Sequence, residues 1–363
     1  EDWYALARLV YWAGLLGSRV LLSSATLTPA EVNGLFMAYQ QGRIAYNQNR
    51  RSNVPKEIVC GWFDENDCQI KKITLQTATE IAHSHNVAFS KEHVIFTKKR
   101  AEFLANESQR RKLAFVSMGE PTPSVKWSTT VSEKLHDTVQ KAHQLNAQTD
   151  PLTQKKYSVG LMRFANIDAL AEVAEKIIKL PPSPDTRLHV CVYHSRFPLL
   201  ARANLEQQLD ELLNRNNNKA PHDVAFVRGW LNQYPEQHHI IVVIASPVAE
   251  VGRDHDYDWI IVEPSSMRSI IQVVGRVRRH RREPYEQPNV FLMETNIRHL
   301  KNPDGVAFSR PGFETAFSFK PQSHFLPDLL SDEQKQRLDS TARIRPRPNF
   351  EYGNFIYLAD LEH

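Results

Sequence analysis

The sequence contains few cysteines and no long run of apolar residues. Its three cysteines form no Cys-x-x-Cys pair, so they indicate neither a disulfide framework nor a zinc site. Arg8 and Arg19 interrupt the most apolar stretch, residues 6–27, which therefore predicts no membrane-spanning helix, and no signal peptide is visible. These absences argue against a secreted or membrane-embedded chain and favour the cytoplasm.

The sequence also lacks the loop that commonly holds the phosphates of ATP. The pattern Gly-x-x-x-x-Gly-Lys-Ser/Thr does not occur, and no glycine is followed directly by lysine. In that loop, backbone amides cradle the phosphates and a hydroxyl helps to hold Mg²⁺. We therefore expect the chain alone to hydrolyse no ATP. It also opens without methionine, in what resembles the middle of a helix, as a fragment of a longer protein would.

The overall composition is that of an ordinary folded protein, with 41% hydrophobic and 24% charged residues. A net charge of +4 is compatible with nucleic-acid binding but does not demonstrate it. The gathering of arginines in residues 276–282 is more informative than the total.

Apolar strands alternate with helices from residue 157 onward. The predicted strands are residues 158–164, 188–194, 239–245, 258–262 and 289–293, and the predicted helices are residues 167–180 and 200–213. The strands are apolar almost throughout, as in parallel sheets that are covered on both faces. The sequence therefore predicts an α/β domain in which helices cover both faces of a parallel sheet.

The first part of the chain is organised differently. Residues 3–16 predict an apolar helix and residues 19–24 a short buried strand, and Thr28 is expected to cap the next helix. Residues 57–75 resemble two strands separated by a turn, and residues 79–150 are predicted to be helical and polar.

Two patterns in this part resemble catalytic motifs. Residues 64–67 read Asp-Glu-Asn-Asp, an acidic form known from nucleotide sites, but they lie in a polar turn and not at the end of a buried strand. His136 and His143 are two helical turns apart, about 10 Å, which is too far for one metal ion to bind both imidazoles. We interpret the first pattern as a turn and the histidines as part of a solvated helix face.

The most specific pattern lies between residues 246 and 282. Two boxes follow each other there, with an apolar strand between them: Gly252-x-Asp254 and Gln272-x-x-Gly275-Arg276-x-x-Arg279. Arginine suits phosphate because its planar fork donates two hydrogen bonds at once and keeps its charge. The glycine of the second box is expected to let the backbone turn tightly, and its arginines share one face if the segment is helical.

Taken in order, the boxes resemble motifs of superfamily-two helicases. Ser24-Ala25-Thr26 is similar to motif III, the glycine–aspartate turn to motif V and the arginine box to motif VI. Together with residues 193–197 ahead of motif V, they resemble the CRISPR-associated helicase–nuclease of type I interference, most closely its I-F form. The resemblance covers motif III and residues 157–282.

The resemblance implies two RecA-like lobes, of which this chain holds only part. The expected domains are residues 1–30, the end of the first RecA-like lobe; residues 31–150, a mixed and mostly helical connecting region; residues 151–297, the second RecA-like lobe with motifs IV, V and VI; and residues 298–363, a linker and the start of a C-terminal accessory region.

The resemblance assigns a nucleotide site to the second lobe. Arg276 and Arg279 would be catalytic, because they match the motif VI arginines that reach the β- and γ-phosphates and stabilise charge in the transition state. Gln272 would steady that cluster. Gly252 and Asp254 would lie near the ribose and phosphates.

Other residues are implied in DNA binding. Ser195, Arg196 and Ser246 would contact phosphates of the DNA backbone, which accept hydrogen bonds from hydroxyl and guanidinium groups. Ser24 and Thr26 match the motif that couples ATP hydrolysis to DNA movement.

The chain departs from the family pattern in motifs V and VI. Pro247 replaces a usual glutamine, Arg253 an apolar residue, and Val273 a common arginine. The departures leave the motif V contact to DNA less well supported than the motif VI assignment. Arg281 and Arg282 extend the basic run and are interpreted as a solvated face.

The implied function is that of the C-terminal motor portion of an ATP-dependent single-stranded-DNA translocase or helicase. With a separate HD nuclease domain, such a protein unwinds and degrades invader DNA in the bacterial cytoplasm. Its cofactors would be ATP and Mg²⁺, bound mainly by the missing first lobe, and a divalent metal in the nuclease domain. Its partners would be single-stranded DNA, a Cascade-type surveillance complex, the adaptation integrase and phage inhibitor proteins.

Two alternatives to this function remain: another superfamily-two DNA or RNA translocase, and a non-catalytic lobe that docks nucleic acid or protein.

Overall fold

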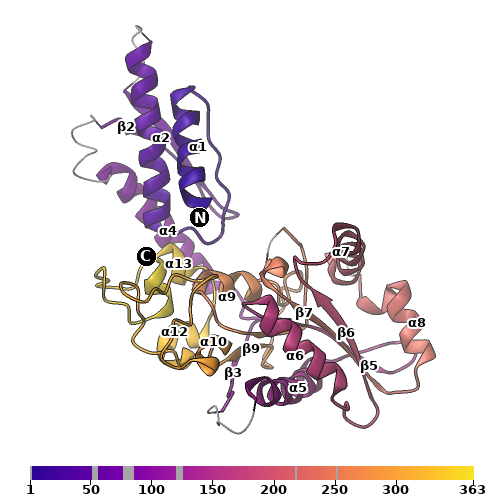
Figure 1. Ribbon diagram of the computed structural model, residues 1–363. Coiled ribbons are helices and arrows are strands. Elements are labelled where there is room, and N and C mark those ends of the chain that lie inside the picture. The colour runs from indigo at the N-terminus through magenta and orange to yellow at the C-terminus, as the bar shows by residue number, and fades with distance from the viewer. Residues whose placement is uncertain (1, 51–55, 77–85, 120–125, 217–218, 251) are drawn as a thin grey trace. The chain divides into compact units, whose positions relative to one another are not determined.

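The computed structural model describes residues 2–50, 56–76, 86–119, 126–216, 219–250 and 252–363. They form two compact units, each with its own core (Figure 1). The first unit contains Glu1–Glu107, Ser340–Phe350 and Glu362–His363, and the second contains Ser108–Asp339 and Glu351–Leu361. No helix within the described ranges is long and apolar enough to cross a membrane.

Two helices that pack along each other frame the first unit. They are α1 (Asp2–Leu15) and α2 (Pro29–Asn49), and both were predicted (Figure 1). A Cβ atom at Gly14 would lie 2.4 Å from a carbonyl oxygen of α2, and one at Gly42 would lie 2.1 Å from a carbonyl oxygen of α1. The close approach of the two helices therefore depends on glycine at both positions.

A two-stranded hairpin and a third helix complete the first unit. Strands β1 (Glu57–Phe63) and β2 (Cys68–Thr74) pair antiparallel, as predicted. The Asp64 carboxylate accepts hydrogen bonds from the amides of Asn66 and Asp67 at 2.8 and 2.7 Å, which confirms that residues 64–67 form a turn. Helix α4 (Val87–Asn106) contributes to a small apolar core made of Phe36, Ile58, Trp62, Ile73 and Phe89.

The strand predicted at residues 19–24 does not form. These residues have no regular secondary structure, and Leu21 is 85% exposed. A strand needs a neighbour to satisfy its backbone groups, and none of the described strands pairs with this segment. The helix start that follows is as predicted, because the Thr28 hydroxyl accepts from the amide of Glu31 and the Glu31 carboxylate accepts from the amide of Thr28.

A parallel sheet forms the centre of the second unit. Its order is β3-β9-β8-β5-β7-β6, with all neighbours parallel, and a short strand β4 pairs antiparallel with β5. The strands are β3 (Leu113–Val116), β4 (Gln148–Thr149), β5 (Lys156–Arg163), β6 (Thr186–Tyr193), β7 (His238–Ala245), β8 (Trp259–Val262) and β9 (Val290–Met293). The five predicted strands are therefore confirmed. The expectation that residues 79–150 are helical is wrong at β3, whose four residues are too short a run to show a periodicity.

Helices α5 (Trp127–Asn146), α6 (Ile167–Lys179) and α10 (Ile297–Lys301) cover one face of the sheet. Figure 1 shows α5 and α6 side by side. On α5, Val131, Leu135, Val139 and Ala142 are buried against the sheet, with Leu135 fully covered. On α6, Ile178 is 59% exposed, because it lies about 100° around the helix from its buried neighbour Ile177.

The other face is covered by α7 (Leu199–Leu213), α8 (Ala225–Gln233) and α9 (Met267–Val274). Contacts from strand side chains of that face identify these helices. Tyr193 donates to Glu206 of α7 at 2.8 Å, His189 stacks on Trp230 of α8 with ring centroids 4.2 Å apart, and α9 packs against β8. Helices thus cover both faces, as predicted.

The chain after residue 303 contains only short helices. They are α11 (Leu326–Leu329), α12 (Asp332–Gln336), α13 (Thr341–Ile344) and the 3₁₀ helix η4 (Leu358–Glu362). Residues 340–350 belong to the first unit, and the residues on either side of them belong to the second.

Candidate functional site

The carboxyl ends of the parallel strands lie at one edge of the sheet. The register aligns Tyr193 with Ala245, Ala245 with Arg163, and Arg163 with Val262. The loops that follow these residues therefore begin side by side, which confirms that the predicted strand-end residues share one edge. We call it the carboxyl edge, and the opposite end of the sheet the amino edge.

A glycine turn at the carboxyl edge presents an ionised carboxylate. Gly252 has a φ of 68°, in the left-handed region that favours glycine. Asp254 follows it and accepts from Arg279 Nε at 2.5 Å and from Asn216 at 3.1 Å, and it pairs with His280 at 3.1 Å. Burial raises the pKa of Asp254, but the hydrogen bonds from His280, Arg279 and Asn216 outweigh burial and lower this pKa to about 2.

The arginines of the box do not lie on a helix. Helix α9 ends at Val274, so Arg276 and Arg279 follow it. The chain turns at Gly275, as expected, but with an ordinary φ of −58°, so this turn does not use the left-handed region that favours glycine; Arg278 adopts that region, with a φ of 46°. Glycine instead relieves crowding, because a Cβ atom at this position would lie 3.3 Å from two carbonyl oxygens of α9.

Arg276 is buried, while Arg279 is partly exposed. Arg276 is 8% exposed and donates from Nη2 to the carbonyl oxygen of Glu250 at 3.0 Å; its Nε has no partner among the described residues. Burial lowers the pKa of Arg276, and the nearby charge of Arg279 lowers it further, yet an arginine stays protonated near neutral pH. Two neighbouring guanidinium groups that retain unused N–H donors are suited to bind an anion. Gln272 lies half-buried on α9, just ahead of them.

An ion pair that the sequence analysis missed lies directly behind this site. Arg163, at the end of β5, is 1% exposed and donates from Nε to the Glu250 carboxylate at 2.5 Å. Ser269 of α9 donates to the other Glu250 oxygen at 3.0 Å. The sequence does contain a signal for this ion pair. Arg163 lies inside a predicted apolar strand, and a charge that is buried there requires a partner.

Further arginines neutralise buried carboxylates directly ahead of β8, at the opposite end of that strand from the carboxyl edge. Asp258 accepts from Arg215 at 2.7 and 3.1 Å and from Arg281 at 2.7 Å, and Arg281 also donates to Asp256 at 2.5 Å. Burial raises the pKa of Asp258, but the charges of Arg215 and Arg281 outweigh it and hold this pKa well below its usual range. The interpretation of Arg281 as part of a solvated face is therefore wrong, whereas Arg282 is exposed.

The predicted DNA-binding residues differ in exposure. Ser195 and Arg196 follow β6 and are exposed, and Arg196 donates to Asp168 at 2.5 Å. Ser246 follows β7 on the same edge but is only 3% exposed, so its hydroxyl lies beneath the surface. Arg253, which stands where the family has an apolar residue, is bound by Glu206 and Asp210 of α7.

Ser24 and Thr26 belong to the first unit, whereas the other predicted site residues belong to the second. Ser24 is exposed, and its hydroxyl accepts from the amide of Thr26 at 3.2 Å. Thr26 is 3% exposed, and Arg343 donates to its carbonyl oxygen at 2.8 Å.

The histidines of α5 are not on a solvated face, contrary to the sequence interpretation. His143 is 2% exposed and lies within hydrogen-bond distance of Ser158 and His238, at 2.8 and 3.0 Å. His136 is 9% exposed, because this side of α5 faces the sheet and the segment at residues 180–183. Among the described residues, no three potential metal ligands come together.

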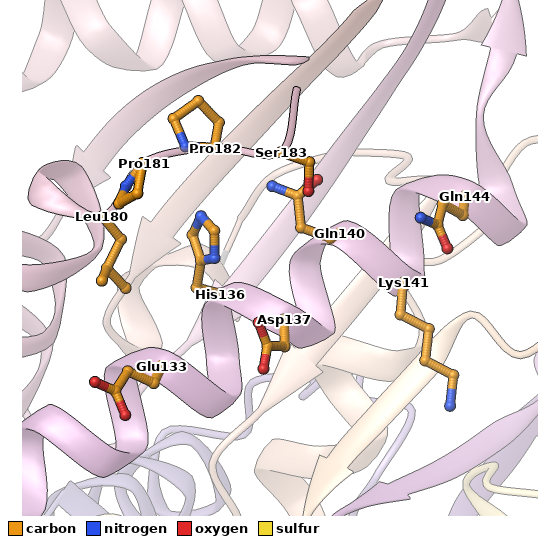
Figure 2. Close-up of a pocket in the computed structure, with 10 residues that line it drawn as sticks. All are labelled: Glu133, His136, Asp137, Gln140, Lys141, Gln144, Leu180, Pro181, Pro182 and Ser183. Carbon is orange, nitrogen blue, oxygen red and sulfur yellow. The ribbon is translucent and has the colours of Figure 1, made fainter. Parts of the chain in front are cut away.

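A separate hollow of about 480 Å³ lies between α5 and residues 180–183. Figure 2 shows His136 and Gln140 extending from α5 towards that segment, whereas Lys141 extends away from it. The lining includes the carboxylates of Glu133 and Asp137 and contains no arginine. Because these two carboxylates stand against a single lysine, Lys141, the lining has no excess of positive charge, so this hollow is a poor candidate for the nucleotide site.

Comparison with known proteins gives matches over the whole chain. Residues 156–282 match the family model described as "CRISPR-associated nuclease/helicase Cas3, C-terminal". The chain is 43% identical to "CRISPR-associated nuclease/helicase Cas3 subtype I-F/YPEST" of Pseudomonas aeruginosa and 40% identical to the protein of that name of Pectobacterium atrosepticum. Both matches cover 100% of this chain but only 33% and 32% of the relatives, so the chain spans about a third of their length.

Solved structures give a fainter likeness. A crystal structure of T. fusca Cas3-AMPPNP is 18% identical, covers 81% of this chain and 28% of that one, and has a TM-score of 0.44. The comparison therefore rests on the similarity of the sequences and not on that of the structures. On this basis, the chain is similar to the C-terminal part of the CRISPR-associated nuclease/helicases Cas3 of subtype I-F/YPEST.

Proposed function

We propose that this chain is the C-terminal motor portion of an ATP-dependent single-stranded-DNA translocase or helicase that, with an HD nuclease domain, unwinds and degrades invader DNA. The observation that supports it most strongly is the gathering of Arg276 and Arg279, which follow α9, with the Gly252–Asp254 turn of the loop between β7 and β8. Neighbouring guanidinium groups are suited to bind a polyphosphate.

In this proposal, Arg276 and Arg279 face the β- and γ-phosphates of an ATP molecule that another lobe holds. Their charges oppose the negative charge that develops during phosphoryl transfer, which is where such arginines contribute most. Arg279 is now paired with Asp254, but both side chains are nearly half exposed. An exposed pair contributes about 0–1 kcal/mol, so a polyphosphate can replace the carboxylate at little cost. Gln272 and Asp254 border the same site.

The described residues fit only part of an ATP–Mg²⁺ site. The unused Nε of Arg276 is suited to a phosphate oxygen. Because the sequence has no phosphate-binding loop and no cluster of metal ligands occurs among the described residues, Mg²⁺ and the nuclease metal would be held elsewhere in a full-length protein.

The DNA track is proposed along the exposed part of the carboxyl edge, at Ser195 and Arg196. Ser246 would act beneath that surface. Ser24 and Thr26 of the first unit would couple hydrolysis to movement. The similarity to Cas3 supports a Cascade-type surveillance complex, the adaptation integrase and phage inhibitor proteins as partners.

The proposal is tested by comparing the full-length protein with the isolated 363-residue chain. We expect ATP hydrolysis by the full-length protein that single-stranded DNA stimulates and RNA does not, and no hydrolysis by the isolated chain. Equal stimulation by RNA would favour an RNA translocase. A full-length protein that binds DNA but hydrolyses no ATP would identify a docking module.

A further inference from the structure

We propose that Glu250 and Arg163 form a buried brace that positions Arg276 in the nucleotide site. The brace is the set of contacts made by these two side chains and Ser269. The inference rests on the proposed role of Arg276 and adds two positioning residues, neither of which needs to touch the nucleotide.

Glu250 holds the arginine through its main chain. The Arg276 guanidinium donates from Nη2 to the Glu250 carbonyl oxygen at 3.0 Å, while Arg276 Nε has no partner among the described residues. The direction in which this guanidinium points therefore depends on where the Glu250 backbone lies. Glu250 is the last residue of a short 3₁₀ helix, η3 (Pro247–Glu250), and the left-handed Gly252 follows closely, so the described residues directly after Glu250 add no regular structure to fix that backbone.

The Glu250 side chain supplies the missing restraint. Both of its oxygens are bound, one by Arg163 Nε at 2.5 Å and the other by the Ser269 hydroxyl at 3.0 Å. Arg163 also donates from Nη1 to the carbonyl oxygen of Glu263 at 2.9 Å. The brace thus joins the ends of β5 and β8, the loop after β7, and α9.

Stability alone does not account for an ion pair in this place. Arg163 is 1% and Glu250 is 8% exposed, so both charges have lost most of their hydration. Replacing such a pair by apolar residues of similar size is often neutral or stabilising. A fixed orientation for the neighbouring arginine is a benefit that an apolar pair would not provide. A displacement of about 1 Å in such a group costs about 10²-fold in rate.

The test uses a full-length protein that carries this chain and the double variant Arg163→Met/Glu250→Met. Both charges are removed together, so neither is left buried without its partner. We expect a melting temperature and a single-stranded-DNA affinity close to those of the wild type. We also expect a kcat for ATP hydrolysis about 10- to 100-fold lower, with a KM for ATP within about threefold.

A matched control removes another arginine–glutamate pair of the same sheet. Arg187 binds Glu236 through two hydrogen bonds, at 3.1 and 2.8 Å, near the amino edge. Arg187→Met/Glu236→Met should leave kcat unchanged. If the brace variant does not fold, Ser269→Ala removes one anchor without leaving a buried charge unpaired, and it should lower kcat several-fold at an unchanged melting temperature.

Wild-type kcat in a folded brace variant would overturn the inference, as would wild-type kcat in Ser269→Ala if the brace variant does not fold. Arg276→Ala, measured in parallel, separates this failure from that of the proposed function. If Arg276→Ala loses turnover while the brace variant keeps it, the brace fails and the nucleotide site stands. If Arg276→Ala also hydrolyses ATP at the wild-type rate, the proposed site itself is wrong.

Discussion

Arginines and histidines gather in two different places of the second unit. The arginine cluster, made of Arg276, Arg279 and Arg281, lies in and just after the turn that follows α9, beside the residues ahead of β8. Its members face carboxylates, and Arg276 retains an unused donor. The amino edge carries histidine pairs: His143 lies 3.0 Å from His238, and His189 lies 3.1 Å from His239. Burial is the main cause that lowers the pKa of both His143 and His189 to about 4, so these rings are neutral at physiological pH.

The difference shows which of the two places is suited to meet an anion. A permanent guanidinium charge is costly to bury and is retained where carboxylates or a polyphosphate can bind it. Neutral imidazoles satisfy each other in the core without attracting an anion. The arginine cluster and the histidine pairs should therefore respond differently to substitution, to acid and to salt.

The largest effect is expected from breaking the buried charge cluster directly ahead of β8. Arg281→Ala would leave Asp256 and Asp258, both with almost fully buried carboxylates, without one of their cations. The free energy of unfolding should fall by about 3–5 kcal/mol, measured by urea denaturation. Arg282→Ala, at the exposed neighbouring position, is the control and should change little. Equal stability of the two variants would show that Arg281 is dispensable.

A smaller effect is expected from acid at the amino edge. The pKa values of His143 and His189 lie below that of an unfolded histidine, so the unfolded chain binds more protons between about pH 6.5 and pH 4. Stability should fall by roughly 2–4 kcal/mol as the pH is lowered through this window. The Asp254 carboxylate, with a pKa of about 2, loses its stabilising ionisation only at lower pH.

The acid effect can be assigned by substitution. His143→Gln keeps a hydrogen-bonding side chain that does not titrate, so its melting temperature should depend less on pH between 6.5 and 4. An undiminished dependence would place the acid sensitivity elsewhere in the chain.

The smallest effect is expected at the exposed end of the carboxyl edge. Arg196→Ala should weaken single-stranded-DNA binding evenly for oligo-dT and a mixed sequence, and reduce the salt slope by about one unit. Asp168→Ala is a matched variant, because it frees Arg196 from its carboxylate and should strengthen binding slightly. An unchanged salt slope with a lowered melting temperature would show that Arg196 serves the fold and not the DNA.

The sequence was informative where one residue pattern determines one element. The five apolar strands and the capped start of α2 follow from local patterns, and so does the shared edge of the loops. The pattern failed at residues 19–24, where an apolar run has no described strand to pair with. It also failed at β3, which is too short to show a periodicity.

The pairing of charges could not be read from the sequence. In the sequence, Arg281 is only the end of a basic run. Its two carboxylate partners, Asp256 and Asp258, precede β8, and the chain returns to them only after β8 and α9. Glu250 and Arg163 are far apart in sequence, and only the parallel register places them together. The box residues Gly252, Asp254, Arg276 and Arg279 could be singled out because their spacing itself is the signal, and their role in binding a nucleotide stays a prediction.

The most direct test of the central claim is the steady-state ATPase rate of a full-length protein with Arg279→Ala, measured with saturating single-stranded DNA. The account predicts a kcat at least about a hundredfold lower, with a modest change in nucleotide binding, because Arg279 acts on charge that develops in the transition state. Wild-type turnover in this variant would contradict the claim that the segment after α9 supplies the arginines of the nucleotide site.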